Sequence, residues 1–150
     1  MEKLITTKSI VKSITFIVLL VSIIGCNKNT PLSPKENMMQ ILTDGIWDIE
    51  SVNVDGTDFM STHRGMTISF DRNSYNCQYG YPVWPETGAW DFMDEEGNII
   101  VRGDGLEVHL FDVTSKKLHL SFLWDETIYT GGKTEGISGE YVFVFRKRFN

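Results

Sequence analysis

The side chains best suited to chemistry stand on two neighbouring apolar stretches that read as a β-hairpin. A turn at residues 114–117 and the period-two alternation of strands would pair His109 with Phe122 on the interior face. Two residues further along, Glu107 would face Trp124. A carboxylate, an imidazole and an indole N–H at the end of an apolar wall can orient the polar head of an amphipathic molecule. We therefore predict a ligand-binding mouth formed by Glu107, His109 and Trp124.

Other reactive residue types do not assemble into a recognisable centre. The three histidines, His63, His109 and His119, lack the spacing of metal ligands, and the predicted register turns the last two to opposite sides. Cys77 stands in a tyrosine-rich strand with no base nearby in sequence, which is typical of a buried structural thiol. We expect no metal and no cofactor, and the chain lacks a catalytic motif. The sequence therefore predicts a protein that is not an enzyme.

The elements that would position these residues are almost all strands. No long amphipathic helix is available for βαβ crossovers, so strands that are neighbours in sequence are expected to pair antiparallel. Eight strands in about 105 residues favour a small up-and-down barrel, in which closure removes exposed edges. A two-sheet β-sandwich is the alternative. The predicted strands are 46–54, 66–70, 74–81, 89–93, 99–102, 106–113, 118–124 and 140–146.

The net charge of −6 conceals two different segments. Residues 1–25 carry three lysines and one glutamate, a charge of +2. Residues 26–150 hold 11 basic and 19 acidic side chains, a charge of −8. A protein that binds phosphate backbones needs clustered cations, so this acidic body argues against nucleic acid as a partner.

The N-terminal segment 1–25 has the features of a signal peptide. Basic residues precede an apolar run at 14–24, which is too short to span a bilayer as a mature helix. The run ends in Ile23-Ile24-Gly25-Cys26, which resembles the bacterial lipobox. That resemblance implies cleavage before Cys26, lipidation of its thiol and acylation of the new amine. Several acyl chains hold a domain to a membrane far more firmly than one.

The resemblance to lipoproteins also implies a location. Asn27, and not aspartate, follows Cys26, so the commonest inner-membrane retention signal of such lipoproteins is missing. We therefore expect a cell-envelope protein anchored by lipid in the outer membrane, with the facing leaflet left open. Residues 26–43 form the tether. Within it, Ser33 as N-cap and Pro34 at the first helical position predict a short helix through Leu42.

A further resemblance concerns the barrel domain, residues 44–150. Gly45-Ile46-Trp47 opens the first strand and Arg146 lies near the end of the last one. This arrangement is similar to lipocalins, in which an early tryptophan stacks on a late arginine and closes one end of the barrel, as cation–π attraction favours. With the lipobox and the short tether, the chain resembles the lipocalin-like domain lipoproteins of Gram-negative bacteria. The resemblance implies barrel closure by Trp47 and Arg146.

Two functions remain open at this point. A small barrel either keeps a cavity for one small ligand or fills its centre with side chains. In the first case the protein binds a small hydrophobic or amphipathic molecule in the barrel. In the second it is a packed scaffold whose loops, including Trp84 and residues 125–138, bind an envelope protein or a polysaccharide.

Overall fold

The computed structural model describes residues 31–130 and 133–149, of which 32–149 belong to one compact unit. The predicted signal peptide and the lipidation site at Cys26 lie outside the described residues. In the part that the structure describes, no helix is long and apolar enough to cross a membrane.

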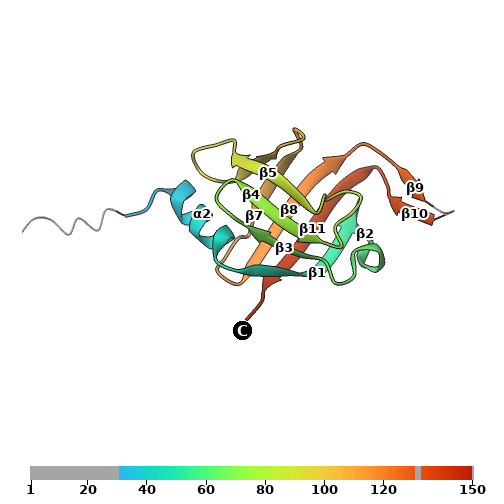
Figure 1. Ribbon diagram of the computed structural model, residues 1–150, viewed down its shortest axis with the longest axis horizontal. Helices are drawn as coiled ribbons and strands as arrows, with labels where there is room; N and C mark the ends of the chain where they lie inside the picture. The colour runs from blue at the N-terminus through green and yellow to red at the C-terminus, as the bar shows by residue number, and fades with distance from the viewer. Residues whose placement is uncertain (1–30, 131–132, 150) are drawn as a thin grey trace, which may run out of the picture. The chain divides into compact units, whose positions relative to one another are not determined.

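The strands form a closed antiparallel barrel (Figure 1). Nine strands follow one another in the order β11-β8-β7-β6-β5-β4-β3-β1-β2, and a further pairing of β11 with β1 closes the ring of eight. β2 is an additional short strand beside β1, and β9 and β10 form a separate two-stranded sheet. The strands are β1 (Ile46–Val54), β2 (Thr57–Asp58), β3 (Thr67–Phe70), β4 (Ser74–Gln78), β5 (Thr87–Phe92), β6 (Ile99–Arg102), β7 (Glu107–Phe111), β8 (Lys117–Trp124), β9 (Ile128–Thr130), β10 (Lys133–Gly136) and β11 (Gly139–Lys147).

The predicted all-β, eight-stranded barrel is thus confirmed, and the sandwich alternative is not. Neighbouring strands in sequence pair antiparallel around the ring, as expected when no helices are available for crossovers. The predicted bounds of β1 and β6 agree with the structure. The segment 125–138, predicted to be either a flap or an extended hairpin, contains the β9–β10 pair.

Alternating side chains of the strands fill the barrel. In β4 and β7 buried and exposed residues alternate without interruption, because successive side chains of a strand point to opposite faces. The fully buried aromatic side chains are Trp47, Trp84, Tyr141, Phe143 and Phe145.

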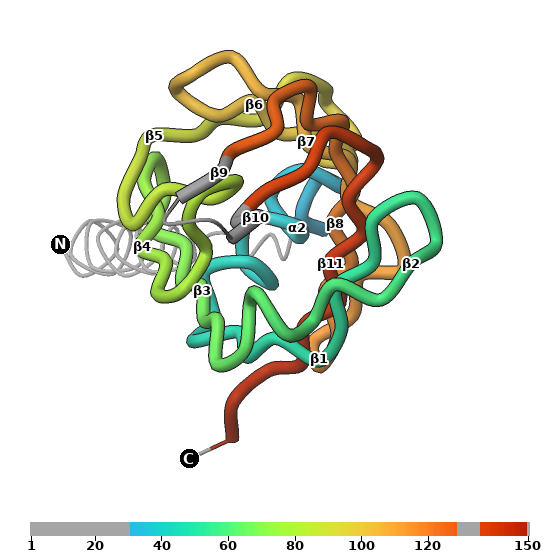
Figure 2. Tube along the Cα trace, turned by 90° about the vertical axis from the view of Figure 1, so that its right-hand side faces the viewer, coloured from blue at the N-terminus to red at the C-terminus, as the bar shows by residue number. Residues whose placement is uncertain are grey.

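One short helix, α2 (Pro34–Thr43), lies across one end of the barrel. Figure 2 looks along the barrel from the end that carries β9 and β10, with α2 behind the opposite opening. The predicted start is confirmed: Ser33 is the N-cap, Pro34 is the first helical residue, and Ser33 and Glu36 form a reciprocal capping box. Leu42 is fully buried in the barrel core.

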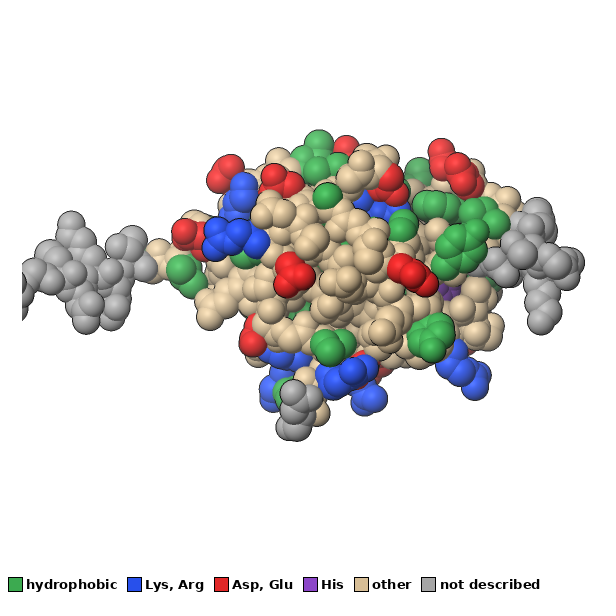
Figure 3. Space-filling model, viewed as in Figure 1, with side chains coloured by type: hydrophobic (Ala, Val, Ile, Leu, Met, Phe, Trp, Pro, Cys, Tyr) green, Lys and Arg blue, Asp and Glu red, His purple; other side chains and the backbone are tan. Residues whose placement is uncertain are grey.

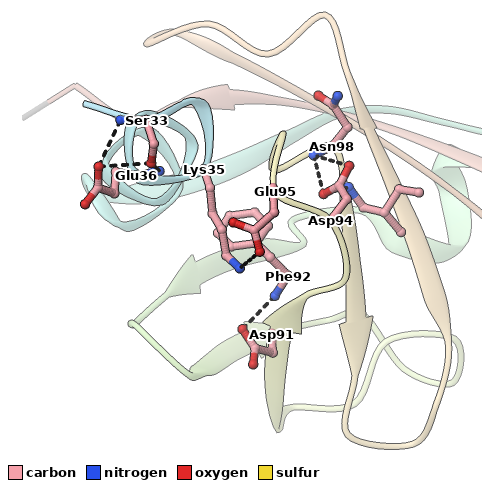
Figure 4. Close-up of polar contacts among 9 residues, drawn as sticks. Ser33, Lys35, Glu36, Asp91, Phe92, Asp94, Glu95 and Asn98 are labelled. Carbon is pink, nitrogen blue, oxygen red and sulfur yellow. Dashed lines mark hydrogen bonds and ion pairs between the residues drawn. The ribbon is translucent and has the colours of Figure 1, made fainter. Parts of the chain in front are cut away.

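Polar and aromatic contacts hold α2 to the β5–β6 hairpin (Figure 4). The Lys35 ammonium lies 5.9 Å from the centre of the Phe92 ring and 3.5 Å from a carboxylate oxygen of Glu95. The hairpin itself is ordered by Asp94, whose carboxylate accepts hydrogen bonds from the backbone N–H groups of Asn98 and Ile99. The helix therefore packs on a hairpin that has its own internal hydrogen bonds.

The predicted closure by Trp47 and Arg146 is not what the structure shows. Trp47 is fully buried and its indole Nε1 donates a 3.0 Å hydrogen bond to the Leu42 carbonyl, whereas Arg146 is exposed. Arg146 pairs in register with Asp48, so it alternates to the outer side of the barrel. Helix α2, held by Trp47, closes this end instead.

The register of the β7–β8 hairpin also differs from the prediction, by one residue. His109 pairs with Ser121 and Phe111 with His119, not with Phe122 and Leu120. As a result Val108 and Leu110 face the core. Glu107 and His109 are exposed on the outer face, so the predicted interior mouth is wrong in this respect.

A bulge at Asp112 accounts for the shift. At the turn, the Thr114 N–H donates to the Lys117 carbonyl, which is the predicted register. From there to the Phe111–His119 pair the β7 side has one more residue than the β8 side. Asp112 accommodates this residue with a φ of 48°, in the left-handed region that aspartate tolerates better than most side chains.

Candidate functional site

The interior of the barrel is occupied by Trp84. The loop between β4 and β5 turns inward, and the backbone N–H of Trp84 donates a 2.8 Å hydrogen bond to the Gly80 carbonyl. The Trp84 ring is fully buried, with its centre 5.6 Å from that of Tyr75, 5.7 Å from that of Phe122 and 6.4 Å from that of Phe143. The sequence left open whether this indole is exposed or folds back onto the barrel. It folds back.

Gly80 makes this inward fold sterically feasible. A Cβ added at Gly80 would lie 2.5 Å from the Cys77 Sγ and 2.8 Å from both the Cβ and the carbonyl oxygen of Trp84. Such distances are far inside van der Waals contact, and two of the three atoms belong to backbone or Cβ positions that cannot rotate away. The close approach of Trp84 therefore requires glycine at residue 80.

The buried side chain of Arg102 packs against the Trp84 ring. The guanidinium carbon of Arg102 lies 4.9 Å from the centre of the Trp84 ring, and its Nη1 donates a 2.7 Å hydrogen bond to the Val83 carbonyl. Arg102 is 3% exposed, and Asp104 supplies its counter-charge through two hydrogen bonds. The guanidinium beside Asp104 lowers the pKa of that carboxyl. Buried charge is tolerated here because it is paired and hydrogen-bonded.

His63 is the second polar group in the interior. It ends the short 3₁₀ helix η1 (Met60–His63) and is fully buried against the rings of Phe59, Tyr141 and Phe143. Burial lowers the pKa of His63 to about 4, while the Phe59 carbonyl acts in the opposite direction without reaching hydrogen-bond geometry. The imidazole is therefore neutral at pH 7.

Several buried ring nitrogens lack a hydrogen-bond partner in the described part of the chain. They are both nitrogens of His63 and the indole Nε1 atoms of Trp84 and Trp124, together with Nε2 of His119. Buried polar groups are normally paired, so each one is a position where a water or ligand group would be stabilised. His63, Trp84 and Trp124 all belong to segments that line the barrel interior or its rim.

The predicted site residues do not gather inside the barrel. Glu107 and His109 lie on the outer face of β7, and Trp124 is half-buried at the end of β8. A role of Glu107, His109 and Trp124 in ligand binding stays a prediction, but the first two cannot line the interior in this register. Sequence reasoning missed Arg102 as an interior residue, because a charged side chain on a strand ordinarily faces solvent.

Cys77 lies in the core, as predicted for a structural thiol. It is 3% exposed, and burial raises the pKa of its thiol to about 12. A thiol of this pKa carries almost no thiolate at neutral pH, so it is a poor nucleophile. Among residues 31–130 and 133–149 no three histidine, cysteine, aspartate or glutamate side chains are placed to hold a metal ion.

The outer side of β3, β4 and β5 presents a different surface. Its outward side chains on β4 are exposed and uncharged, those on β5 include the exposed Asp91, and two exposed tyrosines follow β4. Figure 3 shows this side of the barrel as mainly uncharged polar side chains and backbone, with few charged groups near its centre. A hollow of about 470 Å³ lies on it, lined by Asn76, Cys77, Gln78, Tyr79, Glu86 and Thr87.

The alternation of polar and apolar side chains in β4 predicts this outer surface from sequence alone. Asn76 and Gln78 alternate with Tyr75 and Cys77, so a strand with its apolar side inward must present both amides outward.

Comparison with known proteins adds no relative: no protein-family model matches the sequence, and no curated protein matches it significantly.

Proposed function

We propose that this chain is a lipid-anchored protein of the bacterial outer membrane whose lipocalin-like barrel is a packed scaffold. Its outer surface and loops bind a protein or polysaccharide partner in the envelope. The observation that carries this choice is Trp84, which occupies the barrel centre and is held there by Arg102.

The packing explains why the scaffold is preferred to a carrier. A ligand in the barrel centre would have to displace a fully buried indole and leave the Arg102 guanidinium without its aromatic face and without the Val83 carbonyl. Breaking a buried, hydrogen-bonded charge is costly. Binding at the surface requires no such rearrangement.

Binding of a small hydrophobic or amphipathic molecule in the barrel is the second candidate. It is favoured by the unpartnered nitrogens of His63, Trp84 and Trp124. A ligand with a hydroxyl or carbonyl group would satisfy such nitrogens while its apolar part contacts the surrounding rings. Retention of one defined small molecule by the purified protein would favour this candidate over the scaffold.

The anchor follows from the resemblance of residues 23–26 to a lipobox. Only six residues lie between Cys26 and Ser33, the N-cap of α2. Even fully extended, the seven steps from Cys26 to Ser33 reach at most about 25 Å. In the proposed arrangement the barrel end that α2 closes is therefore the end nearer the membrane, and the β9–β10 end is the more distant one.

Replacement of Cys26 tests the anchor, and Cys77 provides the matched control. Wild-type protein expressed with its own signal should incorporate labelled palmitate and fractionate with outer membranes. Cys26→Ser should lose both properties, whereas Cys77→Ser should keep both because Cys77 lies in the core. Membrane association of Cys26→Ser that survives high salt and cleavage of the signal would refute lipid as the anchor.

Photocrosslinking in intact cells tests the binding role. A photoreactive side chain at the exposed positions Tyr81, Phe111 or Leu123 should capture a discrete envelope component from at least one face. The same group at Phe122, inside the barrel, should not. Crosslinks confined to the Phe122 position would contradict the scaffold and favour the interior ligand.

A further inference from the structure

We propose that the outer face of β3, β4 and β5, together with Tyr79 and Tyr81, binds a neutral oligosaccharide. The inference deepens the proposed function, since it rests on a scaffold that binds through its outer surface and names the class of partner. We refer below to this set of side chains as the β4 face. Its members are Thr67, Ser69, Asn76, Gln78, Tyr79, Tyr81, Glu86 and Thr87.

Strand pairing brings the polar members of the β4 face together. Thr67 of β3 pairs with Gln78 of β4, and Ser69 pairs with Asn76. Asn76 in turn pairs with Thr87 of β5. Directly opposed side chains on one face lie about 5 Å apart, so the hydroxyls and amides form a continuous hydrogen-bonding surface across three strands.

The polar members of the β4 face are available to a ligand. Asn76, Gln78, Glu86 and Thr87 are exposed, and within the described part of the chain their side chains make no hydrogen bond or ion pair. The hollow of about 470 Å³ lies between them. Its volume is within the usual range of small-molecule sites.

Two exposed tyrosines follow β4 in the chain. Tyr79 lines the hollow and is 69% exposed, and Tyr81, two residues later, is 62% exposed, although tyrosine ordinarily buries most of its ring. The Tyr79 ring lies toward Gly65, in the loop before β3, where a Cβ added at Gly65 would be 3.9 Å from a ring carbon. Tyr79 also lines the hollow, so its side chain belongs to the β4 face.

The backbone at Tyr79 is strained. Its φ is 57°, in the left-handed region that is unfavourable for a bulky side chain. Glycine or asparagine would adopt this conformation at lower energy, so folding alone gives no reason for tyrosine at residue 79. Strain of this kind is found at functional sites, where a side chain is held in one direction.

The chemistry of the β4 face matches a sugar better than other partners. A pyranose offers apolar C–H groups that pack on an aromatic ring and hydroxyls that both donate and accept hydrogen bonds. Amides and hydroxyls supply both functions, and the Glu86 carboxylate accepts from hydroxyls. The face lacks the basic side chains that an anionic headgroup or nucleic acid requires, and Figure 3 shows few charges near its centre.

Titration of the mature lipoprotein with two soluble tetrasaccharides tests the proposal. The protein is isolated from membranes in a detergent without sugar headgroups, and chitotetraose and cellotetraose are added while binding is followed by calorimetry and by saturation-transfer NMR. At least one of them should bind. Tyr81→Ala and Tyr79→Gly should each weaken binding about tenfold, because each removes one stacking ring. Glycine at 79 keeps the left-handed backbone accessible, so this variant should fold.

The control is Leu123→Ala, which removes an equally exposed apolar side chain from β8 and should leave sugar affinity unchanged. Absence of binding by both sugars, or affinities unchanged in both tyrosine variants, would overturn the proposal. Capture of an envelope protein at Tyr81 without sugar binding would also overturn it while leaving the scaffold intact. Failure of the scaffold is recognised separately, by crosslinks confined to the barrel interior.

Discussion

The guanidinium carbon of Arg102 lies 4.9 Å from the centre of the Trp84 ring, inside a barrel whose other described interior side chains are mainly apolar. Trp84 belongs to the β4–β5 loop and Arg102 ends β6, so this contact ties a loop to the barrel wall. The contact makes the β4–β5 loop part of the barrel core. The consequence is a barrel whose binding surface is expected on the outside.

Replacing Trp84 by alanine should strongly destabilise the protein. The substitution leaves a large cavity and removes the aromatic face from Arg102, and truncation of a buried tryptophan costs about 3–5 kcal/mol. Urea denaturation followed by circular dichroism measures the loss. Tyr81→Ala in the same loop, where the ring is exposed, should change the free energy of unfolding by less than about 0.5 kcal/mol. Equal losses in the two variants would show that Trp84 is not the core residue of this loop.

Gly80→Ala should also destabilise the barrel, through crowding. The added methyl group would meet Cys77 and the Trp84 backbone, and overpacking of this kind costs about 1–3 kcal/mol. The control is Gly103→Ala, whose nearest neighbour, the Ala89 Cβ, would lie 3.4 Å away. That substitution should lower the melting temperature much less. A Gly80→Ala protein as stable as wild type would contradict the close approach of the loop.

The buried imidazole of His63 should make the fold less stable in mild acid. Its pKa is about 4 in the folded protein and about 6.5 in the unfolded chain, so the unfolded state binds more protons between these values. The contribution of neutral His63 is therefore complete above pH 6.5 and is lost as the pH falls toward 4. The full effect is on the order of 3 kcal/mol.

Denaturation of His63→Gln between pH 4 and pH 7.5 measures this effect. The variant should lose most of the pH dependence in that window, whereas His109→Gln, at an exposed histidine, should keep it. A pH dependence that is unchanged in His63→Gln would assign the titration to other groups. Such a result would indicate that the imidazole of His63 is solvated.

The hydrogen bond from Trp47 should secure α2 on the barrel end. Trp47→Phe removes the indole N–H and leaves the Leu42 carbonyl unpaired, which costs about 1–3 kcal/mol. Amide hydrogen exchange in α2 should then become faster than in the strands. Trp124→Phe is the matched control, because its buried Nε1 has no partner among the described residues. Slow exchange in the Trp47→Phe helix would show that Leu42 burial alone holds α2.

Local features of this fold are predictable from sequence. Ser33, Pro34 and Glu36 predict the start of α2 because capping depends on residues within one turn. The alternating apolar residues of β1 and β6 predict their bounds for the same reason. The number of strands and the lack of a long amphipathic helix favour a barrel over a sandwich, and the pairing of β11 with β1 decides between them.

The β7–β8 register is not predictable in the same way. Val108 and Leu110 on one face, and Phe111 on the other, give both faces an apolar pattern, so alternation alone does not choose between them. The choice depends on the bulge at Asp112, a single left-handed residue. The interior placement of Trp84 and Arg102 depends on contacts between a loop and a distant strand, for which no local pattern exists.

Native mass spectrometry of the protein, expressed with its own signal and isolated in a mild detergent, tests the packed scaffold most directly. With Trp84 in place, the spectrum should show the polypeptide, with the acyl chains proposed for Cys26, and no additional retained molecule. A single defined small molecule that remains bound to the wild-type protein, and is lost in a folded His63→Gln variant, would contradict the scaffold and place the ligand inside the barrel.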